Sequence, residues 1–160
     1  MDLALATGRG PAVVTDLDGG GRLVRDEDVV HLGRRDAEEA EAAGSRRIEE
    51  TTITLIDLAT VRGDGAERAA AEAVAHLDRP ELDGFWIHLD CDVLDDAIMP
   101  AVDYRMPDGL RWDELEAVLR VATASGRVRG VEVTIFNPAL DPDGSIAAAL
   151  VASLVAGLQS

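Results

Sequence analysis

With 160 residues, the chain is long enough for one domain with a hydrophobic core. It carries 31 Asp and Glu against 15 basic residues, all of them arginine, and its formal net charge of −16 argues against nucleic acid and anionic membranes as partners. A single cysteine excludes an intrachain disulfide framework, and we find neither a signal peptide nor an apolar run of membrane-spanning length, so we expect a cytoplasmic protein.

Helix and strand patterns alternate along the sequence. In chain order, the first half predicts a helix end at 1–7, a loop at 11–25, a strand at 28–33, an acidic helix from 36 to about 50 with a candidate break at Gly44-Ser45, a strand at 53–57 and a helix at 66–77. The second half predicts a buried strand from Phe85, a loop at 96–108, a helix at 110–124, a strand at 128–135, a turn at 141–144 and a helix at 145–158. Such alternation is typical of βαβ units with a mainly parallel sheet. We therefore predict an α/β fold forming one domain over residues 1–160, and the small number of strands suggests that it is incomplete at the N-terminus.

The strand from Phe85 runs directly into a group of carboxylates, in the sequence FWIHLDCDVLDD at 85–96. On an extended backbone, residues two apart point to the same side, so Asp90 and Asp92 are expected to project together from the strand end. Paired carboxylates suit hard cations such as Mg, Mn or Ca. The alternative is that the two aspartates only solvate a loop.

Several motifs in this order resemble the arginase, agmatinase and formimidoylglutamase family of ureohydrolases. They are HLGRRD at 31–36, IHLDCDVLD at 87–95, Pro100, Gly109-Leu110 and Asn137-Pro138. The family fold is a three-layer α/β/α domain with a parallel sheet, and two Mn ions in it share a hydroxide that attacks a guanidinium or formimino carbon. The resemblance covers roughly the last four fifths of the chain and corresponds to the C-terminal half of a ureohydrolase.

The resemblance implies roles for four acidic residues. Asp90 and Asp92 match the last pair of metal-binding aspartates, and Glu38 and Glu41 lie where the family has acidic residues near the far end of the substrate. The implied substrate is a small guanidino or formimino compound, and the implied assembly is a homo-oligomer.

The sequence also departs from the family pattern. The family's other metal-binding motifs, Gly-Gly-Asp-His and Asp-x-His-x-Asp, do not occur in this sequence, so we expect this chain alone to be inactive. Ile135 stands where the family has a glutamate that holds the guanidinium, Asp96 replaces a proline, and Asp108 replaces a glycine. Ile135 cannot pair with a cation, which leaves the identity of the substrate open.

His88 and Cys91 flank the predicted metal ligands. His88 is either a third ligand or, as is more usual for a lone histidine on a strand, a satisfied core residue. Cys91 is interpreted as a small buried hydrophobic residue.

Two other functions compete with the metal-dependent hydrolase. One is a non-catalytic ureohydrolase-derived module, favoured by the incomplete set of ligands. The other is a haloacid-dehalogenase-like phosphatase, because VVTDLDGG at 13–20 resembles the nucleophile motif of that family. That chemistry normally needs a lysine to hold the phosphoryl group, and this sequence contains none.

Overall fold

The computed structural model describes residues 2–159, and this part of the chain divides into two compact units. The first comprises residues 2–31 and 36–55, and the second comprises residues 32–35 and 56–159. The chain passes between the units along strands β1 (Val30–Arg34) and β2 (Thr54–Asp57), which pair in a two-stranded sheet. Met1, where the first predicted helix begins, lies outside the described residues. That residues 1–160 form a single domain stays a prediction.

The first unit consists of short helices joined by loops. Its helical segments are α1 (Asp2–Ala6), α2 (Ala12–Thr15), η1 (Asp26–Asp28), α3 (Ala37–Ala42) and η2 (Ile48–Glu50). Its buried residues include the polar Thr7 and Asp26 as well as the apolar Ile53. Polar contacts therefore contribute to its interior.

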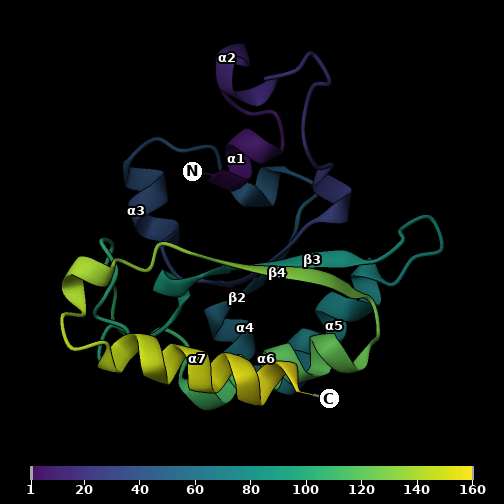
Figure 1. Ribbon diagram of the computed structural model, residues 1–160. Coiled ribbons are helices and arrows are strands. Elements are labelled where there is room, and N and C mark those ends of the chain that lie inside the picture. The colour runs from purple at the N-terminus through teal and green to yellow at the C-terminus, as the bar shows by residue number, and fades with distance from the viewer. Residues whose placement is uncertain (1, 160) are drawn as a thin grey trace. The chain divides into compact units, whose positions relative to one another are not determined.

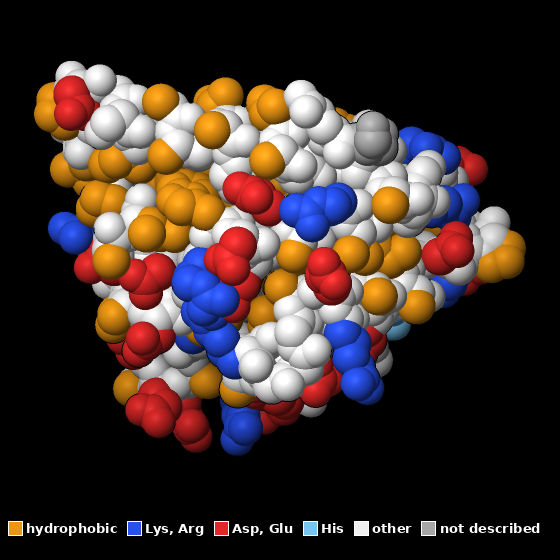
Figure 2. All heavy atoms as spheres, turned by 90° about the horizontal axis from the view of Figure 1, so that it is seen from below, with side chains coloured by type: hydrophobic (Ala, Val, Ile, Leu, Met, Phe, Trp, Pro, Cys, Tyr) orange, Lys and Arg blue, Asp and Glu red, His pale blue; other side chains and the backbone are white. Residues whose placement is uncertain are grey.

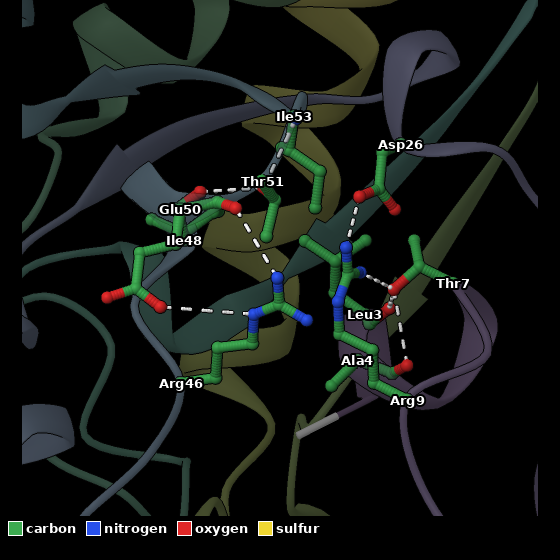
Figure 3. A network of polar contacts seen from close by, with 10 residues as sticks. All are labelled: Leu3, Ala4, Thr7, Arg9, Asp26, Arg46, Ile48, Glu50, Thr51 and Ile53. Carbon is green, nitrogen blue, oxygen red and sulfur yellow. Dashed lines mark hydrogen bonds and ion pairs between the residues drawn. The ribbon is translucent and has the colours of Figure 1, made fainter.

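Figure 3 shows the network around Arg9, whose guanidinium donates to the Asp26 carboxylate and to the Thr7 hydroxyl. The Thr7 hydroxyl in turn donates to the Leu3 carbonyl at 2.7 Å. Because the Arg9 guanidinium hydrogen-bonds to the charged carboxylate, the pKa of Asp26 lies below its usual value. This ion pair joins the end of α1 to η1.

The second unit is built on a parallel strand pair with helices on one side. Strand β3 (Phe85–Asp90) pairs in parallel with β4 (Val128–Thr134). Figure 1 shows α5 (Ala66–Leu77), α6 (Trp112–Ala124) and α7 (Ser145–Leu158) along the same side of this pair. The connection through α6 is what a parallel pairing requires, because parallel strands need a crossover. The buried residues between these elements include Leu89, Leu115, Leu119 and Leu150.

Aspartates fix the start of two helices in the second unit. Asp57 accepts hydrogen bonds from the Thr60 backbone N–H and hydroxyl, both at 2.8 Å, and so caps α4 (Leu58–Asp64). These bonds to its charged form hold the pKa of Asp57 below the usual value. Asp141 accepts from the N–H groups of Ile146 and Ala147 and so caps the start of α7.

The predicted elements differ from the structure in a few places. The acidic helix expected from 36 to about 50 ends at Ala42, next to its candidate break, because the chain takes a left-handed turn at Gly44, where φ is +70°. Helix α4 was not predicted, and the loop expected at 11–25 contains the short helix α2. Within residues 2–159, none of the helices is of a length and apolarity that would carry it across a membrane.

Candidate functional site

Alternate side chains of strand β3 point to opposite faces of the sheet. Leu89 is buried on the helix-covered face, whereas Trp86 and His88 on the other face are exposed. The strand register places three residues of β3 opposite three of β4: Trp86 opposite Gly130, His88 opposite Glu132 and Asp90 opposite Thr134. The face that carries Asp90 is therefore polar at the carboxyl end of the strands.

The two predicted metal ligands lie on either side of a turn. Asp90 is the last residue of β3, and Asp92 belongs to the 3-10 turn η3 (Cys91–Val93) that follows. The backbone N–H of Asp92 donates to Oδ1 of Asp90 at 3.3 Å, and both residues are partly buried. The sequence-based expectation assumed an extended backbone through Asp92, and this premise is wrong because the strand ends at Asp90. The structure still brings the two residues together, and their binding of a metal stays a prediction.

Cys91, between the two aspartates, is completely buried, as expected. Burial raises the pKa of its thiol to about 11, and the neighbouring carboxylates of Asp90 and Asp92 act in the same direction. The thiol is therefore protonated at neutral pH, and this state disfavours both nucleophilic attack and metal ligation.

Arg35 holds the backbone of the turn that carries Asp92, a role that the sequence reasoning missed. Its Nη2 donates to the Asp92 carbonyl at 2.7 Å. The same nitrogen also donates to the carbonyls of Leu94 at 3.3 Å and Met106 at 3.1 Å, while Nη1 and Nε donate to those of Val93 and Pro107, both at 3.3 Å. One guanidinium thus joins the turn after β3 to Met106 and Pro107, at the end of the following loop.

The two ends of that loop, at residues 96–108, lie close together. Asp95 accepts the backbone N–H of Gly109 at 3.1 Å and that of Ala97 at 2.9 Å, so its carboxylate joins both ends of the loop. Leu94 and Leu110 form a bridge between them. Asp95 therefore has a structural partner for each of its carboxylate oxygens.

His88 does not have the environment expected for a core histidine. Its side chain is 47% exposed, and Nδ1 lies 2.6 Å from the Glu132 carboxylate on the neighbouring strand. Nε2 lies 3.4 Å from the Thr134 hydroxyl. The interpretation as a buried, satisfied residue is thus wrong, because the sheet face that carries His88 is exposed. Its assignment as a third metal ligand stays a prediction.

Ile135 and Asp108 share a backbone conformation that is rare outside glycine. Their φ angles are +68° and +62°. Asp108 stands where the family has a glycine, and aspartate is among the residues that tolerate this region. Ile135 follows Thr134, the strand partner of Asp90, and the residue is 41% exposed. Strand β4 ends one residue earlier than predicted because Ile135 leaves the extended region.

Glu38 and Glu41 lie on α3, where both are exposed. Their spacing of three places them on the same face of that helix. They belong to the first unit, whereas Asp90 and Asp92 belong to the second. Their predicted contact with substrate stays a prediction.

A metal site needs more donors than this region supplies. In the part of the chain that the structure describes, no group of three or more His, Cys, Asp or Glu side chains is arranged to hold a metal ion. Asp90 and Asp92 offer the hard oxygen donors that Mn prefers. The donor type therefore fits Mn, but two carboxylates fall short of a full coordination sphere.

The structure also bears on the phosphatase alternative. Asp16 and Asp18 are exposed residues that follow the short helix α2 and do not stand at a strand end. Their carboxylates accept backbone N–H groups from Gly21 at 2.7 Å and Gly20 at 3.1 Å. They stabilise a turn, which disfavours the role of nucleophile and general acid.

Comparison with known proteins gives a consistent result. A model of the arginase family matches residues 20–159. The N(omega)-hydroxy-L-arginine amidinohydrolase of Streptomyces lavendulae is 38% identical over 120 residues, which are 74% of this chain and 42% of that protein. The arginase of Bacillus caldovelox is 29% identical over 157 residues, which are 96% of this chain and 51% of that protein.

Solved structures agree with these sequence matches. The structure of Bacillus caldovelox arginase is similar with a TM-score of 0.85 at 28% identity, over 99% of this chain and 51% of that one. The formimidoylglutamase of Bacillus subtilis shares the fold with a TM-score of 0.69 at 22% identity, over 89% of this chain and 44% of that one. The chain thus spans about half the length of these relatives, and the expected arginase-like α/β fold is confirmed over that half. Because the family model covers most of its residues, this chain belongs to the arginase family.

Proposed function

We propose that these residues form part of the active site of a Mn-dependent hydrolase that cleaves a C–N bond in a small guanidino compound. The observation that carries the proposal is the family match over residues 20–159, which includes Asp90 and Asp92 at the carboxyl end of a parallel strand pair. In open α/β sheets this edge is where ligands bind. The proposed setting is a cytoplasmic homo-oligomer without nucleic acid or membrane partners.

Each proposed site residue has a defined task. Asp90 and Asp92 contribute carboxylate ligands to Mn²⁺, and Glu38 and Glu41 bind the polar far end of the substrate. Bound Mn²⁺ would supply an activated water as nucleophile. The protein's own contribution in the second unit is to hold the two carboxylates in place, through the Asp92 N–H bond to Asp90 and the tethered backbone around them.

The preferred substrate class is an N-hydroxyguanidine. Ile135 offers no carboxylate to a guanidinium cation, and N-hydroxylation makes a guanidine a weaker base that is less dependent on such a partner. The 38% identity to a Streptomyces lavendulae protein named N(omega)-hydroxy-L-arginine amidinohydrolase supports this choice. Arginine and agmatine are expected to be poor substrates.

A second candidate is a non-catalytic module derived from the same family. It is favoured by the uncharged Ile135 at the substrate position and by the two-carboxylate donor set. Under this alternative, the end of β3 would keep its structural contacts, and the protein would have no hydrolytic activity. Metal binding and hydrolysis distinguish the two functions.

Mn²⁺ titration monitored by electron paramagnetic resonance tests the metal assignment in the chain itself. We expect weak, saturable binding that Asp92→Ala abolishes, since one of two donors is lost. Glu72→Ala, which removes an exposed charge on α5 in the same unit, is the matched control and should leave binding unchanged. Equal binding in the Asp92 variant and the unsubstituted chain would refute the assignment.

Hydrolysis is tested in the longest natural form that contains these 160 residues. We expect release of hydroxyurea from N-hydroxyarginine to exceed release of urea from arginine or agmatine. Ile135→Glu should shift this preference toward arginine, because it restores a carboxylate partner for the cation. Efficient cleavage of arginine with Ile135 in place would contradict the substrate proposal, and no turnover of any guanidino compound would favour the non-catalytic module.

A further inference from the structure

Arg35 lies immediately after β1, and the proposed function gives its side chain no contact with the metal or the substrate. It is partly buried, and its guanidinium donates hydrogen bonds to five backbone carbonyls. Three of these carbonyls belong to consecutive residues of the turn after β3, namely Asp92, Val93 and Leu94. The other two belong to Met106 and Pro107, at the far end of the loop.

A second contact brings the same strand end against the same turn. Gly33 has φ of +89°, and a Cβ there would lie 2.7 Å from Cγ2 of Val93. The end of β1 therefore approaches the turn too closely for a side chain at position 33. Arg35, two residues later, reaches the carbonyls of that turn because of this close approach.

We propose that Arg35 is a positioning residue for the carboxylate of Asp92. Its guanidinium binds the carbonyls of the turn on one side and those of the loop on the other, so the backbone that carries Asp92 has a fixed place beside Asp90. Converging carbonyl dipoles repel one another, and a cation with several donors in a planar fork satisfies them together. The inference rests on the proposed function, because the proposed function assigns Asp92 as a metal ligand.

Lysine is the informative replacement at this position. It keeps the positive charge but has a flexible ammonium in place of the planar fork, so it cannot reach five carbonyls at once. Arg35→Met removes the charge as well. Arg127→Lys is the matched control, because Arg127 also donates to two carbonyls, those of Arg79 and Leu82, at the opposite end of the strand pair.

Two measurements on the full chain test the proposal. The first is ¹⁵N relaxation of the folded protein without metal. In Arg35→Lys and Arg35→Met we expect the order parameters of residues 92–94 to fall from about 0.85 to below about 0.6, and in Arg127→Lys we expect them to stay in the rigid range. A residue that only adds to global stability would not move this local quantity.

The second measurement is Mn²⁺ affinity, for which we expect a loss on the order of tenfold in Arg35→Lys and none in Arg127→Lys. Unchanged order in both Arg35 variants would overturn the proposal. So would lost order with unchanged Mn²⁺ affinity, because Arg35 would then serve the fold and not the carboxylate. If the unsubstituted chain binds no Mn²⁺, the proposed metal site fails first, and the positioning role fails with it.

Discussion

Gly109 is the residue at which a single methyl group should do most damage to the predicted site. It is buried beside the bridge between Leu94 and Leu110. A Cβ at Gly109 would lie 2.3 Å from the carbonyl carbon of Leu94 and 2.4 Å from the backbone nitrogen of Asp95. Because these are backbone atoms, no change of rotamer relieves the contact. Gly109→Ala must therefore separate the two segments.

The separation puts three hydrogen bonds at risk. They are Leu110 N–H to the Val93 carbonyl at 2.8 Å, Asp95 N–H to the Leu110 carbonyl at 3.0 Å, and Gly109 N–H to the Asp95 carboxylate at 3.1 Å. At about 0.5–1.5 kcal/mol for each bond, their loss lowers the free energy of unfolding by about 1.5–4.5 kcal/mol. This is a large part of the roughly 5–15 kcal/mol that typically stabilises a folded protein.

Urea denaturation followed by circular dichroism measures this loss. With a denaturant dependence of about 2 kcal/mol per molar, we expect the midpoint of Gly109→Ala to fall by roughly 1–2 M. The control is Gly63→Ala in α4, where a Cβ meets nothing within 4 Å. That variant gains helix propensity, so its stability should rise by up to about 1 kcal/mol. A loss below about 0.5 kcal/mol in Gly109→Ala would show that the close approach does not constrain the chain.

Three further predictions concern capping, pH and assembly. The lowered pKa of Asp57 contributes stability that is present above the ordinary carboxyl pKa of about 3.9 and is lost as the pH falls through the folded-state pKa. Asp57→Asn keeps an N-cap residue but removes this titration, so the unfolding free energy should depend less on pH in acid. An unchanged pH dependence in acid would contradict this prediction. Asp141→Ala should lower the unfolding free energy by about 1–2 kcal/mol in a urea titration. Asp143→Ala removes an exposed carboxylate with one N–H partner in α7 and should lower the unfolding free energy by less. Equal losses in the two variants would refute the capping role of Asp141. Helix α7 exposes Val151 and Val155, and Figure 2 shows hydrophobic side chains among the charged ones on the face seen from below. Light scattering of the isolated chain should therefore detect an assembly larger than a monomer, and a monomer with sharp, cooperative thermal unfolding would argue against this prediction.

Local signals were sufficient to predict helices with clear ends. Helices α5 and α7 begin and end at the predicted residues, because glycines at positions 65 and 144 interrupt the chain just before each helix. Helix α4 was missed although its signal is local, since Asp57 is an N-cap residue and Thr60 supplies the matching donors. The lesson is that a short helix directly after a strand is recognised by its cap more readily than by hydrophobic periodicity.

The candidate site was only partly predictable for a physical reason. Asp90 could be placed at a strand end because an apolar run leads directly into it. The 3-10 turn at Asp92 could not be predicted, since its geometry depends on contacts made by Arg35. That arginine is 57 residues from Asp92 and 71 from Met106 along the sequence, and no local pattern reveals which carbonyls it will meet. Close approaches such as those at Gly33 and Gly109 likewise emerge only from the folded chain.

Ile135 is the residue at which the sequence is expected to depart from the family pattern. A β-branched residue in the left-handed region costs about 1–2 kcal/mol, so its own preference does not explain the conformation at φ +68°. The following residues do explain it, because the Asn137 N–H donates to the Ala101 carbonyl and its side-chain amide donates to Asp103, both at 2.8 Å. The loop contacts thus fix the backbone path while the side chain at position 135 has lost the expected charge. Since strain of this kind concentrates at functional positions, the proposed function predicts that Ile135 changes which substrate binds and leaves the scaffold around Asp90 and Asp92 intact.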